Sequence, residues 1–329
     1  MRSFEYVSPT TREQAVALLS PTRGETAVLA GGTDLLAMMK DDVMAPGRVV
    51  NLKAIDGLGH ITFKRGAGLR LGALVTIQQL IGHDGVRRTF PALVTAAAGI
   101  KSPQIRAMGT VGGDLCQRPR CWFFRSGHGL LALAGDGRSL VVRGDNRYHA
   151  ILGNSGPAYF VNPSSLAPAL IALGAEVVIF GPAGSRTIAA EKFHTTPRSP
   201  REQENVLAPD EIVTQIRVPD PEGSLNAAYE VRPRKVIDWP LAAAAVSLRE
   251  EGGIVRSARV VLGHVAPVPW RSPEAEITLL GRTVTEQVAE EAGAAAVARA
   301  KALSGNGYKI RLARVAVKRT ILATQRGGA

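Results

Sequence analysis

Two glycine-rich stretches decide the fold, Ala30-Gly31-Gly32-Thr33-Asp34-Leu35-Leu36 and Gly109-Thr110-Val111-Gly112-Gly113-Asp114-Leu115. The first follows residues 26–29, which are typical of a buried strand, and precedes apolar residues whose spacing suits one face of a helix. Thr33 or Asp34 is expected to cap that helix. Each stretch therefore predicts a tight turn between a strand and a helix.

Such a turn gathers unpaired N–H groups and the partial positive charge of a helix start, which suits a pyrophosphate. The absent Cβ atoms of Gly31 and Gly32 would let a ligand approach the backbone, and two such turns could clamp one dinucleotide. The alternative is that each glycine pair serves only as a tight connection. Neither turn has the G-x-G-x-x-G of a Rossmann fold or the G-x-x-x-x-G-K of a P-loop, so those nucleotide-binding classes are disfavoured.

Further blocks accompany the two turns in a consistent order along nearly the whole chain. They are SPQIRAMGTVGGDL at 102–115, NPSSLAPAL at 162–170, PDEIV at 209–213, RPRKVIDWP at 232–240, GHVAPVPWR at 263–271 and YKIRLA at 308–313. With these blocks the chain resembles the FAD-binding medium subunits of the molybdenum hydroxylases. That family includes xanthine dehydrogenase, aldehyde oxidoreductase, carbon monoxide dehydrogenase and 4-hydroxybenzoyl-CoA reductase. Within it, this chain resembles the branch formed by the flavin subunits of aldehyde oxidoreductase and 4-hydroxybenzoyl-CoA reductase.

The resemblance implies an α+β fold, with a two-lobed FAD-binding domain of the PCMH type before a C-terminal α+β domain of the CO dehydrogenase flavoprotein type. We place the first lobe at 1–55, the second at 56–218, a linker rich in breakers and charge at 219–224, and the C-terminal domain at 225–329.

Periodicity and propensity predict the elements within these domains. Helices are expected at 11–19, 35–40, 77–81, 90–98, 284–303 and 310–323. Strands are expected at 26–29, 48–52, 69–73, 242–248 and 257–262. Residues Ile310, Leu312, Ala313, Val317 and Ile321 are expected to form the apolar side of the last helix.

The resemblance also implies FAD as the cofactor and supplies the residues that would bind it. In the first turn these are Leu29, Ala30, Gly31, Gly32, Thr33, Asp34 and Leu35, with the Thr33 hydroxyl as an added donor to the pyrophosphate. Thr110, Gly112, Gly113 and Asp114 would form the opposing wall, and Ser102, Ile105, Gln117, Ser165 and Leu166 would complete the site. No side chain is expected to act as an acid or base catalyst.

Two positions depart from the family pattern. Relatives usually carry Asn where Asp114 stands, and a carboxylate beside a diphosphate needs compensation, which Arg106 or Arg118 could provide. Many relatives have Asp where Ser165 stands, near the isoalloxazine or ribityl region. Loss of that negative charge is expected to raise the flavin potential.

The segment from Cys116 to Arg125 contains the only two cysteines of the chain. In a close branch of the family a similar stretch, with two further cysteines, holds an additional [4Fe-4S] cluster. Such a cluster generally takes four thiolates, so the two present fall short unless His128, His149 or another subunit completes the set. We therefore expect no metal site, and interpret Cys116 and Cys121 as remnant cluster ligands, now buried thiols or residues packed beside the flavin. The six histidines show no metal-binding spacing.

Composition is that of an ordinary globular protein of 329 residues. The formal charge of +12 comes from 40 Lys and Arg spread from end to end, which disfavours nucleic-acid binding. No stretch has the length of a membrane helix, and the first residues lack a signal core. We expect a cytoplasmic location, or a periplasmic one if a partner subunit carries an export signal.

The leading hypothesis is an electron-transfer subunit of a heteromeric molybdenum hydroxylase. Its FAD would pass electrons from the [2Fe-2S] clusters of a small partner subunit to an external acceptor, while a large molybdopterin-binding subunit hydroxylates the substrate. The acceptor stays open among NAD, oxygen, a quinone and a small protein. One alternative is a stand-alone FAD reductase or oxidase of the wider fold that includes UDP-N-acetylenolpyruvoylglucosamine reductase. Another is a flavin-binding scaffold without activity.

Overall fold

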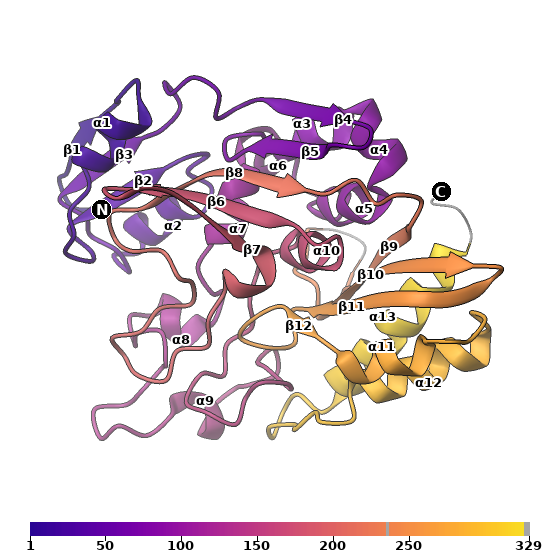
Figure 1. The fold of residues 1–329 in the computed structure, drawn as a ribbon. Coiled ribbons are helices and arrows are strands. Elements are labelled where there is room, and N and C mark those ends of the chain that lie inside the picture. The colour runs from indigo at the N-terminus through magenta and orange to yellow at the C-terminus, as the bar shows by residue number, and fades with distance from the viewer. Residues whose placement is uncertain (235–236, 326–329) are drawn as a thin grey trace.

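The computed structural model describes residues 1–234 and 237–325, and it contains three β-sheets with helices packed around them (Figure 1). The first sheet is parallel, in the order β1-β3-β2, and forms the N-terminal lobe with α1 and α2. These elements are β1 (Glu5–Val7), α1 (Arg12–Ala17), β2 (Thr26–Leu29), α2 (Leu35–Lys40) and β3 (Arg48–Asn51).

The second sheet is antiparallel, in the order β4-β5-β8-β6-β7. Its strands are β4 (Ile61–Lys64), β5 (Gly68–Gly72), β6 (Glu176–Gly181), β7 (Gly184–Ala189) and β8 (Ile212–Val218). Between β5 and β6 lie the helices α3 (Ile77–Gly82), α4 (Asp84–Thr89), α5 (Pro91–Gly99), α6 (Pro103–Met108), α7 (Val111–Cys116), α8 (Trp122–Arg125), α9 (Leu140–Arg143) and α10 (Ala167–Ala172). A short 3-10 helix, η1 (Ala190–Lys192), follows β7.

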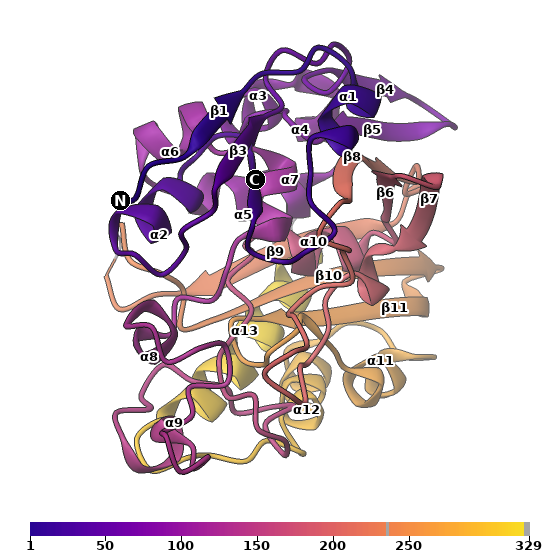
Figure 2. The same cartoon turned by 90° about the vertical axis from the view of Figure 1, so that its left-hand side faces the viewer.

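The third sheet, in the order β12-β11-β10-β9, is also antiparallel and has helices on both faces (Figures 1 and 2). The C-terminal helices cover one face, and α5 and α10 of the second lobe pack on the other. Because both faces are covered, the run 242–246 is buried at every position. The elements are β9 (Leu225–Val231), β10 (Ala242–Glu251), β11 (Ile254–Gly263), β12 (Trp270–Arg271), α11 (Pro273–Leu279), α12 (Glu286–Ala296) and α13 (Tyr308–Thr324).

The predicted α+β fold is confirmed. The strand at 26–29 and the helix at 35–40 have the predicted bounds, and the other predicted elements lie within a few residues of their places, except one. The helix expected at 284–303 ends at Ala296. The N–H groups of Val297 and Ala298 donate to carbonyls three residues back, and the following residues make non-helical hydrogen bonds. The N–H of Lys301 donates to the Ile151 carbonyl at 2.7 Å, and the N–H of Leu303 donates to the Asn306 side chain at 2.7 Å.

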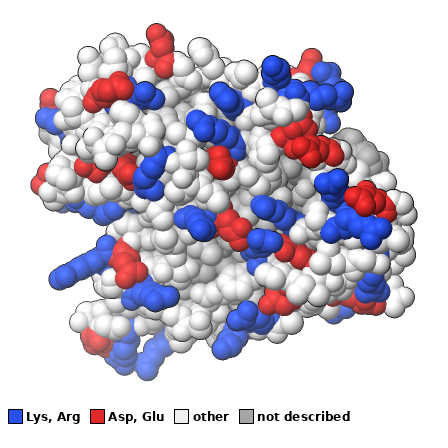
Figure 3. Space-filling model, viewed as in Figure 1, with Lys and Arg blue, Asp and Glu red and all other residues white. Residues whose placement is uncertain are grey.

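On α13, Ala313, Val317 and Ile321 are fully buried as predicted, whereas Ile310 and Leu312 are only partly buried. Within the described residues, no helix is both long enough and apolar enough to span a membrane. Figure 3 shows basic and acidic side chains intermixed on one face of the molecule, without a single basic stripe.

Candidate functional site

The two glycine turns lie against each other, where the loop after β2 crosses the end of α6. A Cβ atom on Gly31 would lie 1.8 Å from the backbone oxygen of Met108, so only glycine allows this crossing. Gly32 has a positive φ of 72°, a conformation that other residues rarely adopt. The prediction that these glycines serve the approach of a ligand is therefore incomplete, because Gly31 first serves the meeting of the turns and Gly32 the bend of its own segment.

The first turn presents a row of free donors. Among the described residues, the backbone N–H groups of Gly31, Gly32, Thr33 and Asp34 donate to no partner. They precede α2 and line a groove, so together they form a cradle for an anion.

The Asp34 carboxylate does not cap α2, although Asp34 occupies the N-cap position. It accepts instead from the backbone N–H of Arg118 at 2.8 Å and forms ion pairs with Arg120 at 3.1 Å and Arg125 at 2.8 Å. The prediction of a side-chain cap by Asp34 is thus wrong, because three donors of the 118–125 segment compete for this carboxylate. Through it the first turn is tied to that segment.

The second turn joins two helices, α6 and α7, so the expectation of a strand before it is wrong. It also has fewer free donors than we expected. The N–H of Val111 donates to Val75, and that of Gly112 donates to Ala73, both at 2.9 Å. The N–H groups of Gly113 and Asp114 donate to the hydroxyl and the carbonyl of Thr110, respectively. In the described structure only the N–H of Thr110 is left unpaired in the run 109–114. The second turn therefore acts mainly as a wall facing the first.

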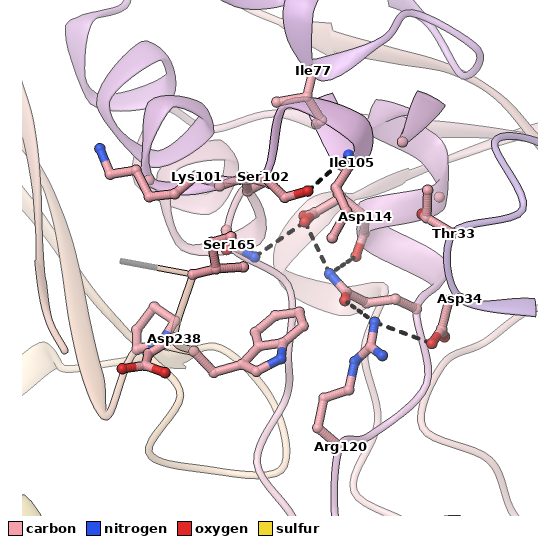
Figure 4. Close-up of a pocket in the computed structure, with 18 of the residues that line it drawn as sticks. Thr33, Asp34, Ile77, Lys101, Ser102, Ile105, Asp114, Arg120, Ser165 and Asp238 are labelled. Carbon is pink, nitrogen blue, oxygen red and sulfur yellow. Dashed lines mark hydrogen bonds and ion pairs between the residues drawn. The ribbon is translucent and has the colours of Figure 1, made fainter. Parts of the chain in front are cut away.

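The Asp114 carboxylate connects the second turn to the 164–166 segment (Figure 4). It accepts from the Ser164 hydroxyl, from the N–H of Leu166 at 3.0 Å and from the N–H of Ser165 at 3.3 Å, and Gln117 Nε2 donates to it at 2.9 Å. Burial raises its pKa, while these hydrogen bonds and the charge of Arg120 act in the opposite direction.

The compensation for Asp114 thus comes from groups other than those proposed from the sequence. Arg106 donates to the carbonyls of Ile100 and Ala98, and Arg118 forms an ion pair with Glu204. Neither arginine reaches the Asp114 carboxylate, because each is already bound elsewhere. The carboxylate also lies beside Ser165, so an acidic group is present here even though position 165 is neutral.

A groove in two connected parts runs along the turns. Thr33, Asp34, Thr110, Gly113 and Gln117 line both parts. One part is also lined by Ser102, Ile105, Asp114 and Ser165, and the other by Ala30, Gly31, Gly32 and Leu35. The structure thus brings together most residues predicted from the sequence. Leu29, Gly112 and Leu166 do not line the groove, because all three are buried in the packing beneath it.

The sequence reasoning missed one wall of the groove. Arg232, Ile237, Asp238, Trp239 and Pro240 of the C-terminal domain line its first part, together with Lys101 and Arg120. The block RPRKVIDWP was the available signal, although no site residue was assigned from it; its residues 235–236 lie outside the described residues.

The two cysteines lie in different surroundings. Cys116 packs against the core of the second lobe and lines the groove, and burial raises its pKa to about 12. Cys121 is buried, with its Sγ 3.2 Å from Nε2 of His149. Across the described ranges, no three His, Cys, Asp or Glu side chains are grouped to hold a metal ion.

The groove has the features that a dinucleotide with an anionic centre requires. The free N–H row lies beside the shared lining of the two parts, and a Cβ atom on Gly113 would meet only the Thr110 hydroxyl, at 3.0 Å. An anion could lie at this junction while ring systems occupy the parts on either side. The residues present therefore fit FAD.

Comparison with known proteins agrees with this geometry. The family model described as the FAD binding domain in molybdopterin dehydrogenase matches residues 2–221, and that of the CO dehydrogenase flavoprotein C-terminal domain matches residues 227–324. The FAD-binding subunit of an aldehyde oxidoreductase from Escherichia coli is 33% identical over 85% of this chain and 86% of its own length.

The carbon monoxide dehydrogenase medium chain of Hydrogenophaga pseudoflava is 31% identical over 97% of this chain and 96% of its own length. A solved structure of that organism's carbon monoxide dehydrogenase contains a chain that superposes with a TM-score of 0.76 at 30% identity, covering 100% of this chain and 99% of that one. These matches confirm the family, the cofactor and the oxidoreductase class expected from the sequence. The chain belongs to the FAD-binding flavoprotein subunits of the molybdopterin dehydrogenases.

Proposed function

We propose that this chain carries electrons through FAD, from the [2Fe-2S] clusters of a small partner subunit to an external acceptor, inside an assembly with a molybdopterin-binding large subunit. The observation that supports this most directly is the row of four free N–H groups at Gly31–Asp34, at the junction of a two-part groove. When bound, FAD can accept electrons singly and release them singly or as a pair.

The residues of the chain would bind and orient the cofactor. We assign the pyrophosphate to the N–H row of the first turn and to Thr110. The part of the groove lined by Ile77, Ile100, Ile105 and Trp239 suits the isoalloxazine, because it is walled by apolar and aromatic side chains. The part lined by Met38, Val43 and Met44 suits the adenine.

The proposed assembly rests on the relatives and on what this chain lacks. The carbon monoxide dehydrogenase medium chain is, by its name, one chain of a larger enzyme. The two cysteines of this sequence are too few for the clusters of the proposed pathway. A stand-alone reductase would need its own substrate pocket with a proton donor.

The test is to purify the tagged chain from its native host and to measure FAD, iron and molybdenum in the same sample. The proposal expects bound FAD together with iron and molybdenum in co-purifying subunits. The chain with Gly113→Ala, which places a methyl group in the groove, should retain the subunits but lose flavin. A wild-type chain that takes up no FAD on reconstitution would refute the proposal. An isolated flavoprotein that turns over a substrate would establish the alternative.

A further inference from the structure

Three cationic side chains line the proposed isoalloxazine part of the groove, namely Lys101, Arg120 and Arg232. Lys101 is exposed, so water and salt screen its charge. Arg232 forms an ion pair with the Glu230 carboxylate, and only 12% of its side chain is exposed, so its charge is cancelled beside the groove. Arg120 is partly buried, which makes it the cation of this wall with the strongest field on a ligand.

Arg120 shares its carboxylate partner with a second arginine. Oδ1 of Asp34 lies 3.1 Å from Nη2 of Arg120 and 2.8 Å from Nη2 of Arg125. One negative charge thus meets two positive charges, and the three side chains together are left with one positive charge. Arg120 lines the groove and 32% of its side chain is exposed, whereas Arg125 lines neither part of the groove and is 17% exposed. The excess positive charge is therefore presented to the groove by Arg120.

Two further contacts hold the Arg120 guanidinium in this position. Its Nη2 donates to Oε1 of Gln117 at 3.3 Å (Figure 4), and its Cζ lies 4.7 Å from the centroid of the Trp239 indole. Gln117 and Trp239 line the same part of the groove. No hydrogen bond among the described residues uses Nη1 of Arg120, so this nitrogen keeps its donors for another group.

Asp114 is the acidic group that opposes this cation. Gln117 lies between the two, because its Nε2 donates to Oδ1 of Asp114 at 2.9 Å while its Oε1 accepts from Arg120. Asp238 also lines this part of the groove, but it forms an ion pair with Arg234 at 2.8 Å. Without Arg120, a ring system in the groove would lie beside a carboxylate whose hydrogen-bond donors carry no formal charge.

We propose that Arg120 raises the redox potential of the bound FAD, by balancing the negative charge that the ring system gains on reduction. The protein's contribution to a flavin enzyme is tuning of this kind, and a positive charge near the ring favours the reduced cofactor. Such an attraction is stronger in a partly buried groove than in water. The inference rests on the proposed function, which places the ring system in the part of the groove that Arg120 lines. Gln117 and Trp239 then position the guanidinium.

The test is the midpoint potential of FAD in the loaded full-length chain, measured against a reference dye. Arg120→Gln should make the equilibrium constant for two-electron reduction at least about tenfold less favourable, which lowers the potential by about 30 mV or more. Arg120→Lys keeps the charge and should shift the potential less than Arg120→Gln does. Arg125→Gln is the matched control, because it removes an equal charge from the same carboxylate, at a residue that does not line the groove. It should change the constant by less than about threefold, since the attraction weakens with distance.

A second measurement keeps the test decisive if Arg120→Gln weakens FAD binding. Titration of the apo-chain with oxidised FAD and with reduced FAD gives two dissociation constants. Their ratio changes by the same factor as the equilibrium constant for reduction, because binding and reduction form a closed cycle.

Equal potentials in wild type and Arg120→Gln would overturn the proposal. Equal shifts in Arg120→Gln and Arg125→Gln would also overturn it, because the effect would then come from Asp34 losing a partner. An equal shift in Arg120→Lys and Arg120→Gln would show that the charge is not the cause. A wild-type chain that binds FAD in neither redox state would refute the proposed function together with this inference. A flavin-loaded complex with its partner subunits, in which the potential does not respond to Arg120→Gln, would refute this inference alone.

Discussion

Replacing Gly31 by alanine tests whether the meeting of the two turns builds the flavin site. The added Cβ would lie 1.8 Å from the Met108 oxygen, whereas ordinary contact begins at 3.4 Å, so the two segments must separate by about 1.6 Å. Such overpacking costs about 1–3 kcal/mol of unfolding free energy. A displacement of this size would also break hydrogen bonds from the N–H row, since these need distances near 2.9 Å.

Loss of about two charge-assisted bonds, each contributing roughly 1.5–3 kcal/mol, should weaken FAD binding by about a hundredfold or more. The assay is urea unfolding of the apo-chain together with FAD titration by fluorescence. Gly113→Ala is the informative partner, because its Cβ has only the Thr110 hydroxyl at 3.0 Å and otherwise enters the groove. It should keep the stability of the apo-chain and lose FAD affinity.

Gly59→Ala is the matched control, because a Cβ there meets nothing within 4 Å. Wild-type stability and wild-type FAD affinity in Gly31→Ala would refute the reasoning about the crossing. A destabilised Gly31→Ala that still binds FAD normally would show that the first turn does not hold the cofactor.

Other perturbations probe the charged groups of the site. Asp114→Leu leaves the N–H groups of Ser165 and Leu166 without their acceptor and should cost about 3 kcal/mol in urea unfolding, whereas Asp114→Asn, which keeps one acceptor oxygen, should cost less. Asp34→Asn removes the ion pairs to Arg120 and Arg125 and should loosen the 118–125 segment, seen as faster amide hydrogen exchange there; unchanged exchange would contradict this. Burial lowers the pKa of His149 and His194 to about 4, below the unfolded value near 6.5, so unfolding takes up protons between these two pH values. The free energy of unfolding should therefore fall as pH drops from 6.5 toward 4, by up to about 1.4 kcal/mol per pH unit for each histidine. Ser165→Asp adds a second carboxylate beside Asp114 and should lower the flavin potential; potentiometry showing no downward shift would remove that idea.

The local structure around the first turn was predictable from the sequence because it depends on local signals. The apolar run before Gly31 and the helical spacing after Asp34 fixed β2 and α2 to their observed bounds. The region after Ala296 was not predictable in this way. Its alanine-rich sequence favours helix, but the chain there bonds to Ile151, more than a hundred residues earlier, and to the nearby Asn306.

The candidate site, like the fold, was predictable only where it depends on local sequence. Residue types near the turns indicated an anion cradle, but the partners of each charged side chain depend on distant segments. Asp34 meets arginines some ninety residues later in the chain, and Asp114 meets a segment some fifty residues later. The wall formed by Trp239 comes from another domain. Spacing within one stretch of sequence carries no information about such pairings.

Asp34 and Asp114, two of the acidic residues that line the groove, explain how a groove for a dianionic pyrophosphate tolerates carboxylates. Asp34 forms ion pairs with Arg120 and Arg125, so its charge is neutralised by guanidinium groups of the 118–125 segment. Asp114 is directed at the Ser164 hydroxyl and two backbone N–H groups, which leaves the Thr110 N–H free. In each case the negative charge is satisfied within the protein, and the unpaired donors remain for the ligand. The carboxylates thus position the turns, and an apolar side chain at either position would weaken FAD binding indirectly, by releasing the segment that the carboxylate holds.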